Sequence, residues 1–115
     1  MPKEIDVLVS EVGPRDGLQS IKRIMPTENK IRWIRALASS GLREIEVGSF
    51  VSPMLMPQMA DCATLVREAN KLENLSVLVL IPNLKTFAVT LPVNHKIIDV
   101  SDTQNQSLTP IFYVH

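Results

Sequence analysis

Residues 75–81 read Leu-Ser-Val-Leu-Val-Leu-Ile, and this segment decides the fold because Ser76 is its only polar side chain. A strand that is apolar on both faces is typical of a parallel sheet whose two faces are covered. Two further short apolar segments precede it, at residues 5–9 and 45–50, and each is followed by enough chain for a helix. Strands at this spacing predict βαβ units with right-handed crossovers.

Amphipathic helices are predicted in both intervals. Thr27 is the expected N-cap of the first helix, and Gly41 is suited to end it because glycine enters the left-handed region without a steric penalty. The second helix is expected to run from about Asp61, its N-cap, to Leu72. The apolar side chains at helical spacing are Ile31, Ile34, Leu37 and Ala38 in the first helix, and Cys62, Leu65, Val66, Ala69 and Leu72 in the second.

The rest of the chain continues the alternation and then departs from it. A short helix is predicted over residues 84–91 and a fourth strand over residues 96–100. Residues 101–110 have no periodicity, so we expect a loop or disordered tail there, and residues 111–114 are too short to form an independent element. The whole order fits an open doubly wound sheet or part of a (β/α)₈ barrel. In both, functional side chains collect at the carboxyl ends of the strands, here residues 11–19, 46–53 and 82–85.

The composition excludes several classes of protein. The 12 basic and 12 acidic side chains sum to zero formal charge, without the excess of Lys and Arg that nucleic-acid binding needs. A hydrophobic content of 45% excludes a disordered chain, and no apolar run approaches the ~18 residues of a membrane span. With one cysteine and no signal-peptide pattern in residues 1–6, we expect a reduced, cytoplasmic protein that binds neither nucleic acid nor membrane.

The segment at residues 11–19, EVGPRDGLQ, places an arginine beside a carboxylate directly after the first predicted strand. In a catalytic interpretation, Asp16 binds a hard divalent cation and Arg15 neutralises an oxyanion on the same substrate. The alternative is an exposed ion pair in a turn, which is common and weak. The residues by themselves leave the two interpretations about equally open.

Glu46 is the second candidate, because it lies inside a predicted strand. Strand alternation puts Ile45 and Val47 on one face of this strand, and Glu44, Glu46 and Gly48 on the other. A buried carboxylate needs a partner, so in a barrel Glu46 would point inward toward the arginine and aspartate of the preceding segment. On an edge strand it would instead be solvated.

Four motifs together resemble the hydroxymethylglutaryl-CoA lyase family. They are EVGPRDGLQ at residues 11–19, IEVGSFVSP at 45–53, PQMAD at 57–61 and PNLK at 82–85, collinear within residues 4–91. The resemblance implies an α/β fold, the N-terminal part of a (β/α)₈ TIM barrel with about four βα units in residues 1–100. Residues 101–115 would form a divergent tail.

The resemblance also implies a reaction, which is retro-aldol cleavage of 3-hydroxy-3-methylglutaryl-CoA into acetyl-CoA and acetoacetate, a step of leucine degradation. It implies an acyl-CoA substrate, a divalent metal (magnesium or manganese) and a homo-oligomeric intact enzyme. By the same resemblance Asp16 would be the metal ligand, and Arg15 and Glu46 would be catalytic. Arg15, Gln19 and Ser49 would contact the substrate. Another metal-dependent aldolase or acyl-CoA condensing enzyme of the superfamily is the alternative.

The sequence departs from the family pattern in one respect. The family's His-x-His metal pair and its late catalytic cysteine have no counterpart among these 115 residues, and Cys62 belongs to an early helix instead. Because a whole barrel takes about 250 residues, we expect a truncated or frame-shifted product. We expect it to be inactive alone, or to persist as a non-catalytic fragment that self-associates through an unpaired strand edge.

Overall fold

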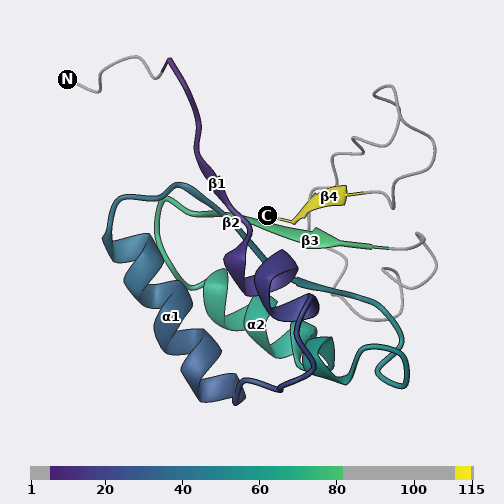
Figure 1. The fold of residues 1–115 in the computed structure, drawn as a ribbon. Helices are drawn as coiled ribbons and strands as arrows, with labels where there is room; N and C mark the ends of the chain where they lie inside the picture. The colour runs from purple at the N-terminus through teal and green to yellow at the C-terminus, as the bar shows by residue number, and fades with distance from the viewer. Residues whose placement is uncertain (1–5, 82–110, 115) are drawn as a thin grey trace.

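One four-stranded sheet with two helices forms the fold, and the computed structural model describes residues 6–81 and 111–114. The strands are β1 (Ser10–Glu11), β2 (Glu44–Ser49), β3 (Ser76–Leu80) and β4 (Ile111–Val114), adjacent in that order (Figure 1). The helices are α1 (Thr27–Ser39) and α2 (Cys62–Ala69), with a π-helical turn η1 (Gly13–Gly17) and a 3₁₀ turn η2 (Pro57–Met59). No helix among the described residues is both long and apolar enough to cross a membrane.

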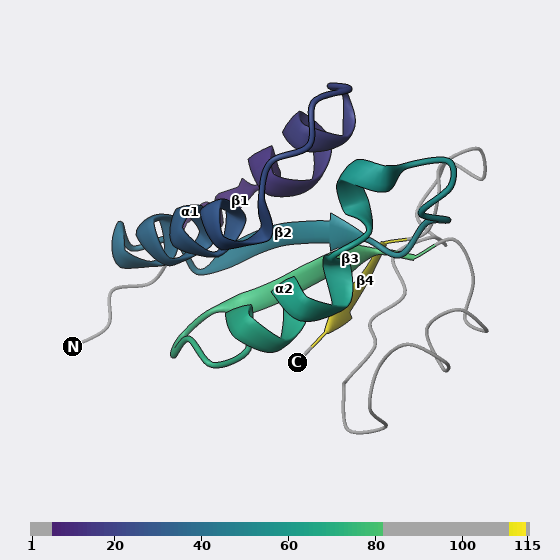
Figure 2. The same cartoon turned by 90° about the horizontal axis from the view of Figure 1, so that it is seen from below.

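The arrangement of the two helices decides between the two predicted architectures. Strands β1, β2 and β3 are parallel and follow one another in chain order, and α1 and α2 lie on the same face of the sheet (Figures 1 and 2). A doubly wound sheet reverses its strand order and therefore carries helices on both faces. Sequential parallel strands with every helix on one face are the arrangement of a (β/α)₈ barrel, in which the other face becomes the interior.

The core lies between the sheet and the helices. Its buried members are Ile45 and Val47 of β2, Val77 and Val79 of β3, Ile34 of α1, Leu65, Val66 and Ala69 of α2, and Phe50, Cys62 and Ile81. The predicted inner faces of both helices are therefore confirmed, with Ile31, Leu37, Ala38 and Leu72 packed at the edge of this core. Gly41 has a φ of 100° directly after the end of α1, as a helix-ending glycine requires.

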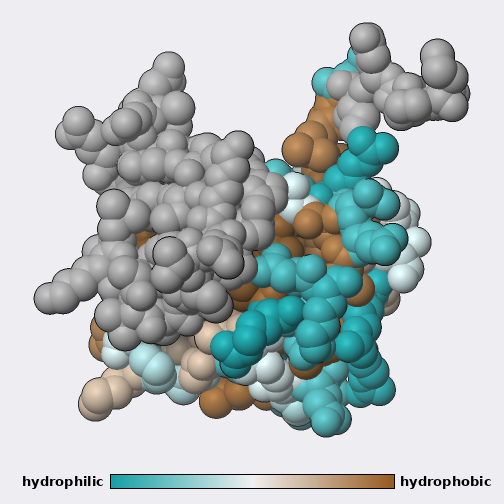
Figure 3. Space-filling model, turned by 180° about the vertical axis from the view of Figure 1, so that it is seen from behind, coloured by the Kyte–Doolittle hydropathy of each residue, from teal (hydrophilic) through white to brown (hydrophobic). Residues whose placement is uncertain are grey.

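The first strand is shorter than predicted and lies later in the chain. Only Ser10 and Glu11 pair with β2, opposite Glu44 and Ile45, whereas residues 6–9 form no strand. Because β2 begins at Glu44, it offers no partner to the residues before Ser10, however apolar they are. Val7 is consequently 74% exposed, and the view from behind shows apolar surface on this extended N-terminal segment (Figure 3).

Two predicted N-caps differ from the structure. Thr27 is the first residue of α1 instead of its cap, and its hydroxyl donates to Asp61 Oδ2 at 2.7 Å. Asp61 does occupy the N-cap position of α2, but its carboxylate accepts no hydrogen bond from that helix end. The Thr27 hydroxyl and the buried Lys30 ammonium, both on α1, bind the two oxygens of the Asp61 carboxylate. Thr27 and Asp61 therefore join the two helices instead of capping them.

The C-terminal segment contains a strand that the sequence did not predict. Ile111–Val114 forms β4, which pairs antiparallel with β3. Its four residues are β-branched or aromatic, and the free edge of β3 supplies the hydrogen-bond partners that a segment of this length cannot supply itself. The helix predicted over residues 84–91, the strand over 96–100 and the loop over 101–110 lie outside the described residues.

A β-bulge interrupts the pairing of β2 with β3. Glu46 pairs with Leu78 but Gly48 pairs with Val79, so Val47 and Gly48 together face one residue of β3. Gly48 therefore turns toward α2, where a Cβ on it would lie 2.8 Å from Cys62 Sγ. The alternation that placed Gly48 on the face of Glu46 is wrong at this point, because the extra residue of a bulge shifts the pattern by one position.

Replacing Gly48 by alanine should destabilise the fold. The new Cβ would collide with Cys62, and overpacking of this kind costs about 1–3 kcal/mol. Gly17→Ala is the matched control, expected within about 0.5 kcal/mol of the wild type, since nothing lies within 4 Å of its Cβ position. Urea unfolding followed by the fluorescence of the single tryptophan measures both. In a Cys62→Ala background the Gly48→Ala penalty should shrink, and an undiminished penalty there would contradict the proposed collision.

Candidate active site

The candidate site is built on η1, at the carboxyl end of β1. The Arg15 and Asp16 amides both donate to the Val12 carbonyl, at 3.1 and 2.7 Å, and wind the segment after β1 into a helical turn. The ring of Trp33 on α1 packs against this turn, 3.0 Å from where a Cβ on Gly13 would be. Any larger residue at position 13 would press on that ring, so the glycine lets η1 lie close to α1.

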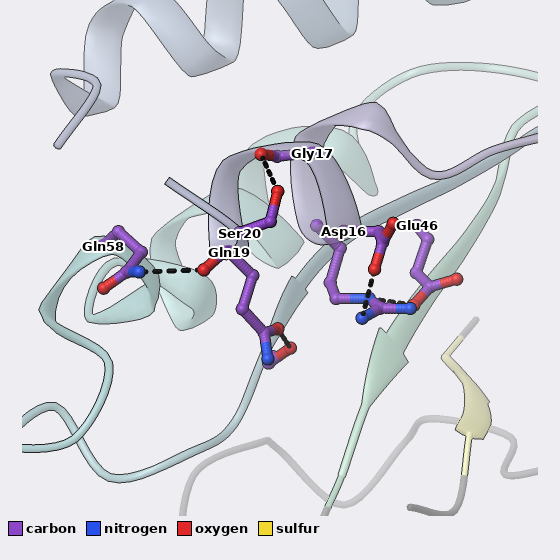
Figure 4. A network of polar contacts seen from close by, with 8 residues as sticks. Asp16, Gly17, Gln19, Ser20, Glu46 and Gln58 are labelled. Carbon is purple, nitrogen blue, oxygen red and sulfur yellow. Dashed lines mark hydrogen bonds and ion pairs between the residues drawn. The ribbon is translucent and has the colours of Figure 1, made fainter. Parts of the chain in front are cut away.

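Arg15 and Glu46 form the central ion pair of the site. Arg15 Nε donates to Glu46 Oε1 at 2.5 Å, and the side chains are 16% and 4% exposed (Figure 4). Of the two interpretations of Glu46, the structure supports the inward-facing carboxylate with a partner, not the solvated edge residue. Glu46 therefore fixes the guanidinium of a residue 31 positions away in the chain.

Asp16 lies beside this pair but is much more open. Its carboxylate is 66% exposed, and Arg15 Nη1 lies 3.3 Å from Asp16 Oδ1. Most of its lone pairs therefore remain available to a hard cation, which is what a metal ligand requires. Within residues 6–81 and 111–114 no group of three His, Cys, Asp or Glu side chains converges, so its role as a metal ligand stays a prediction.

Gln19 and Ser49 are also brought together. The Ser49 hydroxyl donates to Gln19 Oε1 at 2.8 Å. The bulge makes this possible: after the extra residue, Ser49 returns to the face that carries Glu46, while Phe50 joins the core on the helix face. All five predicted site residues thus lie in η1, in the residue pair after it, or in β2, at the carboxyl ends of adjacent parallel strands.

Two residues next to the site were not singled out by the sequence analysis as functional. Gln58 Nε2 donates to the carbonyl oxygens of Gln19 and Ile21, both at 3.0 Å, and Lys30 is 0% exposed inside α1. A signal for Lys30 was present, because it precedes Ile34 by four residues and therefore shares the apolar face of α1. No local pattern marks the role of Gln58, because the partners of its side-chain amide lie more than 35 positions away.

Cys62 is a core residue of α2, as predicted. Burial raises the pKa of its thiol, and the nearby Asp61 carboxylate raises that pKa further. A thiol that resists ionisation is a poor nucleophile, so Cys62 is unsuited to covalent or proton-transfer chemistry.

Parallel strands in chain order, helices on one face and polar side chains at the carboxyl ends of β1 and β2 define part of a (β/α)₈ barrel with its site in the usual place for that class. A family model described as HMGL-like matches residues 6–107. The chain belongs to the HMGL-like family.

Curated relatives in this family are hydroxymethylglutaryl-CoA lyases, which are carbon–carbon lyases. The mitochondrial hydroxymethylglutaryl-CoA lyase of Gallus gallus is 46% identical over 103 residues, covering 90% of this chain and 35% of that protein. The Homo sapiens protein of the same name is 42% identical over 96 residues, or 84% of this chain and 29% of the relative. The chain thus spans about a third of the length of the curated relatives it matches.

Solved structures agree with this assignment. Hydroxymethylglutaryl-CoA lyase from Pseudomonas aeruginosa superposes with a TM-score of 0.67 at 44% identity, over 72% of this chain and 28% of that one. An HMG-CoA lyase from Acinetobacter baumannii, in complex with coenzyme A and 3-methylmalate, gives a TM-score of 0.64 at 40% identity, over 69% of this chain and 26% of that one.

Breaking the ion pair of the site should destabilise the fold. Arg15→Leu leaves the Glu46 carboxylate buried without its cation, which we expect to cost about 3 kcal/mol in the free energy of unfolding. Asp16→Asn, on the exposed neighbour, should change it by less than about 0.5 kcal/mol. Urea titration of both variants tests this. Equal and small effects would mean that the pair contributes nothing to stability.

Cys62 should react slowly while the protein is folded. Because burial raises its pKa, little thiolate forms at pH 8, and we expect alkylation by iodoacetamide at least about 100-fold slower than in urea. Mass spectrometry of timed samples measures the rate. Alkylation of the folded chain at the unfolded rate would contradict the burial of this thiol.

Proposed function

We propose that this chain is the N-terminal part of an enzyme that cleaves 3-hydroxy-3-methylglutaryl-CoA into acetyl-CoA and acetoacetate. The observation that carries the proposal is the contact of Arg15 with Glu46 beside an accessible Asp16, at the carboxyl ends of β1 and β2. The hydroxymethylglutaryl-CoA lyases that match most of this chain support the substrate, and a relative in complex with coenzyme A supports the acyl-CoA class.

The cleavage needs a group that stabilises negative charge on oxygen. A base removes the proton of the tertiary hydroxyl, the carbon–carbon bond breaks, and the electron pair passes to the thioester half as an enolate that is then protonated. Arg15 uses its Nε on Glu46 and directs Nη1 toward Asp16, which leaves guanidinium N–H groups for an oxyanion. Since Glu46 holds this cation in advance, little reorganisation is needed when the charge develops.

A divalent metal, magnesium or manganese, fits the remaining donor. Asp16 offers an exposed hard oxygen ligand, and the further ligands would come from parts of a barrel that the described residues do not include. When bound, such an ion polarises the substrate oxygens and neutralises their charge. Gln19 and Ser49, already joined to each other, would contact the substrate from the same edge of the sheet.

An alternative state of the isolated chain is a non-catalytic fragment that self-associates. The observation that favours it is the exposure of three successive apolar residues before β1, with Val7, Leu8 and Val9 exposed by 74%, 53% and 59%. These residues lie beside the outer edge of β1, which pairs with no other strand among the described residues. Exposed apolar chain at such an edge promotes association between copies.

The purified 115-residue chain should show no cleavage of hydroxymethylglutaryl-CoA, because its sequence lacks the family's His-x-His pair and late cysteine. Joining residues 1–81 to the remaining barrel of the Pseudomonas aeruginosa relative should restore acetoacetate release in the presence of magnesium or manganese. In this chimaera, Arg15→Gln should lower kcat by about 10²–10³-fold. Arg35→Gln, on the outer surface of α1, is the control and should leave kcat unchanged.

Three outcomes would each contradict a different point: the inactivity of the isolated chain, the cleavage reaction or the role of Arg15. Metal-dependent cleavage by the 115-residue chain alone would disprove its predicted inactivity. A chimaera that condenses acetyl-CoA with a 2-oxo acid, without cleaving hydroxymethylglutaryl-CoA, would favour the condensing-enzyme alternative. Full activity after Arg15→Gln would remove Arg15 from the mechanism.

A further inference from the structure

Lys30 is a fully buried lysine that the proposed reaction does not use. Its ammonium donates to the Gln58 carbonyl at 2.6 Å and to Asp61 Oδ1 at 2.7 Å, and Thr27 Oγ1 donates to the other oxygen of the same carboxylate. Taking an ammonium out of water costs several kcal/mol, so a lysine in this place needs partners of this quality. The cluster joins α1 to η2 and to the start of α2.

Gln58 extends this cluster to the candidate site. While its carbonyl accepts from Lys30, its side-chain amide donates to the carbonyls of Gln19 and Ile21, both at 3.0 Å. Figure 4 shows the contact between Gln58 and Gln19. The amides of Leu18 and Ser20 donate to carbonyls of η1, and the Ile21 amide donates to the Leu18 carbonyl. In the part of the chain that the structure describes, the Gln58 amide is the donor from outside this region that binds the main-chain carbonyls of residues 18–24, and it binds two of them.

We propose that Lys30 is a positioning residue for the candidate site. By fixing the main chain of Gln58, it aims the Gln58 amide at residues 19–21, and so holds Gln19 where its side chain meets the Ser49 hydroxyl. Only the consequence for catalysis rests on the proposed function, because the clamp itself is a property of this chain. An exposed lysine or a neutral residue of the same length could not anchor Gln58 in this way.

Amide hydrogen exchange of the 115-residue chain tests the clamp without any substrate. In Gln58→Leu the amide is lost while the carbonyl remains, and in Lys30→Met the anchor is lost. Both should raise exchange in residues 18–24 by about tenfold or more, while Gln58→Leu leaves the amides of β3 at the wild-type rate. Lys71→Met is the matched control, since Lys71 is exposed and pairs with Glu68, and it should leave exchange in residues 18–24 unchanged.

Asp61→Asn covers the case in which Lys30→Met fails to fold, because it weakens the anchor but keeps the lysine and the side-chain volume. It should raise exchange in residues 18–24 by an intermediate factor. Wild-type exchange of that segment in Gln58→Leu, or in whichever anchor variant folds, would overturn the proposal. So would a rise of the same factor in β3, which would mean general destabilisation.

Kinetics of the chimaera described above separate this inference from the proposed function. Gln58→Leu should raise KM more than it lowers kcat, because Gln19 and Ser49 are assigned to substrate contact and Arg15 is untouched. If the unaltered chimaera has no lyase activity, the proposed function fails while the exchange result still decides the role of Lys30. If Gln58→Leu leaves KM unchanged in an active chimaera, the positioning role is overturned.

Discussion

The β-bulge at Val47 and Gly48 is the constraint on which the site depends. Before it, β2 sends Glu46 to the barrel-interior face, and after it the strand sends Ser49 to that same face. In an unbroken strand Ser49 would share the helix face with Ile45 and Val47, where its hydroxyl would be buried among apolar side chains. One extra residue thus lets two polar side chains from a short strand reach the same segment.

A half-buried arginine and a buried lysine then fix what the bulge has brought together. Arg15 is held by Glu46, which ties η1 to β2. Lys30 is held by Asp61, which ties α1 to the start of α2. Both pairs join residues 31 positions apart, which means that they form only when the βαβ units have packed. The Arg15 guanidinium is therefore held in advance by Glu46, as the proposed stabilisation of an oxyanion requires.

Within residues 6–81, the sequence predicted the alternation of strands and helices, both helix faces and the gathering of five candidate side chains at the strand ends, because periodicity and strand-end position carry that information. It misplaced the first strand, since apolar residues 6–9 indicate a strand only if a partner strand extends alongside them. It could not locate the bulge, because the bulge is a shift in the pairing of β2 with β3 and no residue of β2 by itself marks where the shift occurs. The sequence predicted Asp61 as a helix cap, which is a local role. Its contacts with Thr27 and Lys30 span more than 30 positions, so no local pattern could reveal them.

Strand β4 has a consequence for how a longer chain would assemble. It occupies the outer ladder of β3, from the pairing of Leu80 with Ile111 to that of Val77 with Val114, and runs opposite to the other strands. In a (β/α)₈ barrel the next parallel strand must use those same N–H and C=O groups. Pairing of β4 with β3 and closure of the barrel are therefore mutually exclusive. Residues 111–114 would have to leave the edge of β3 before a fourth parallel strand could pair there.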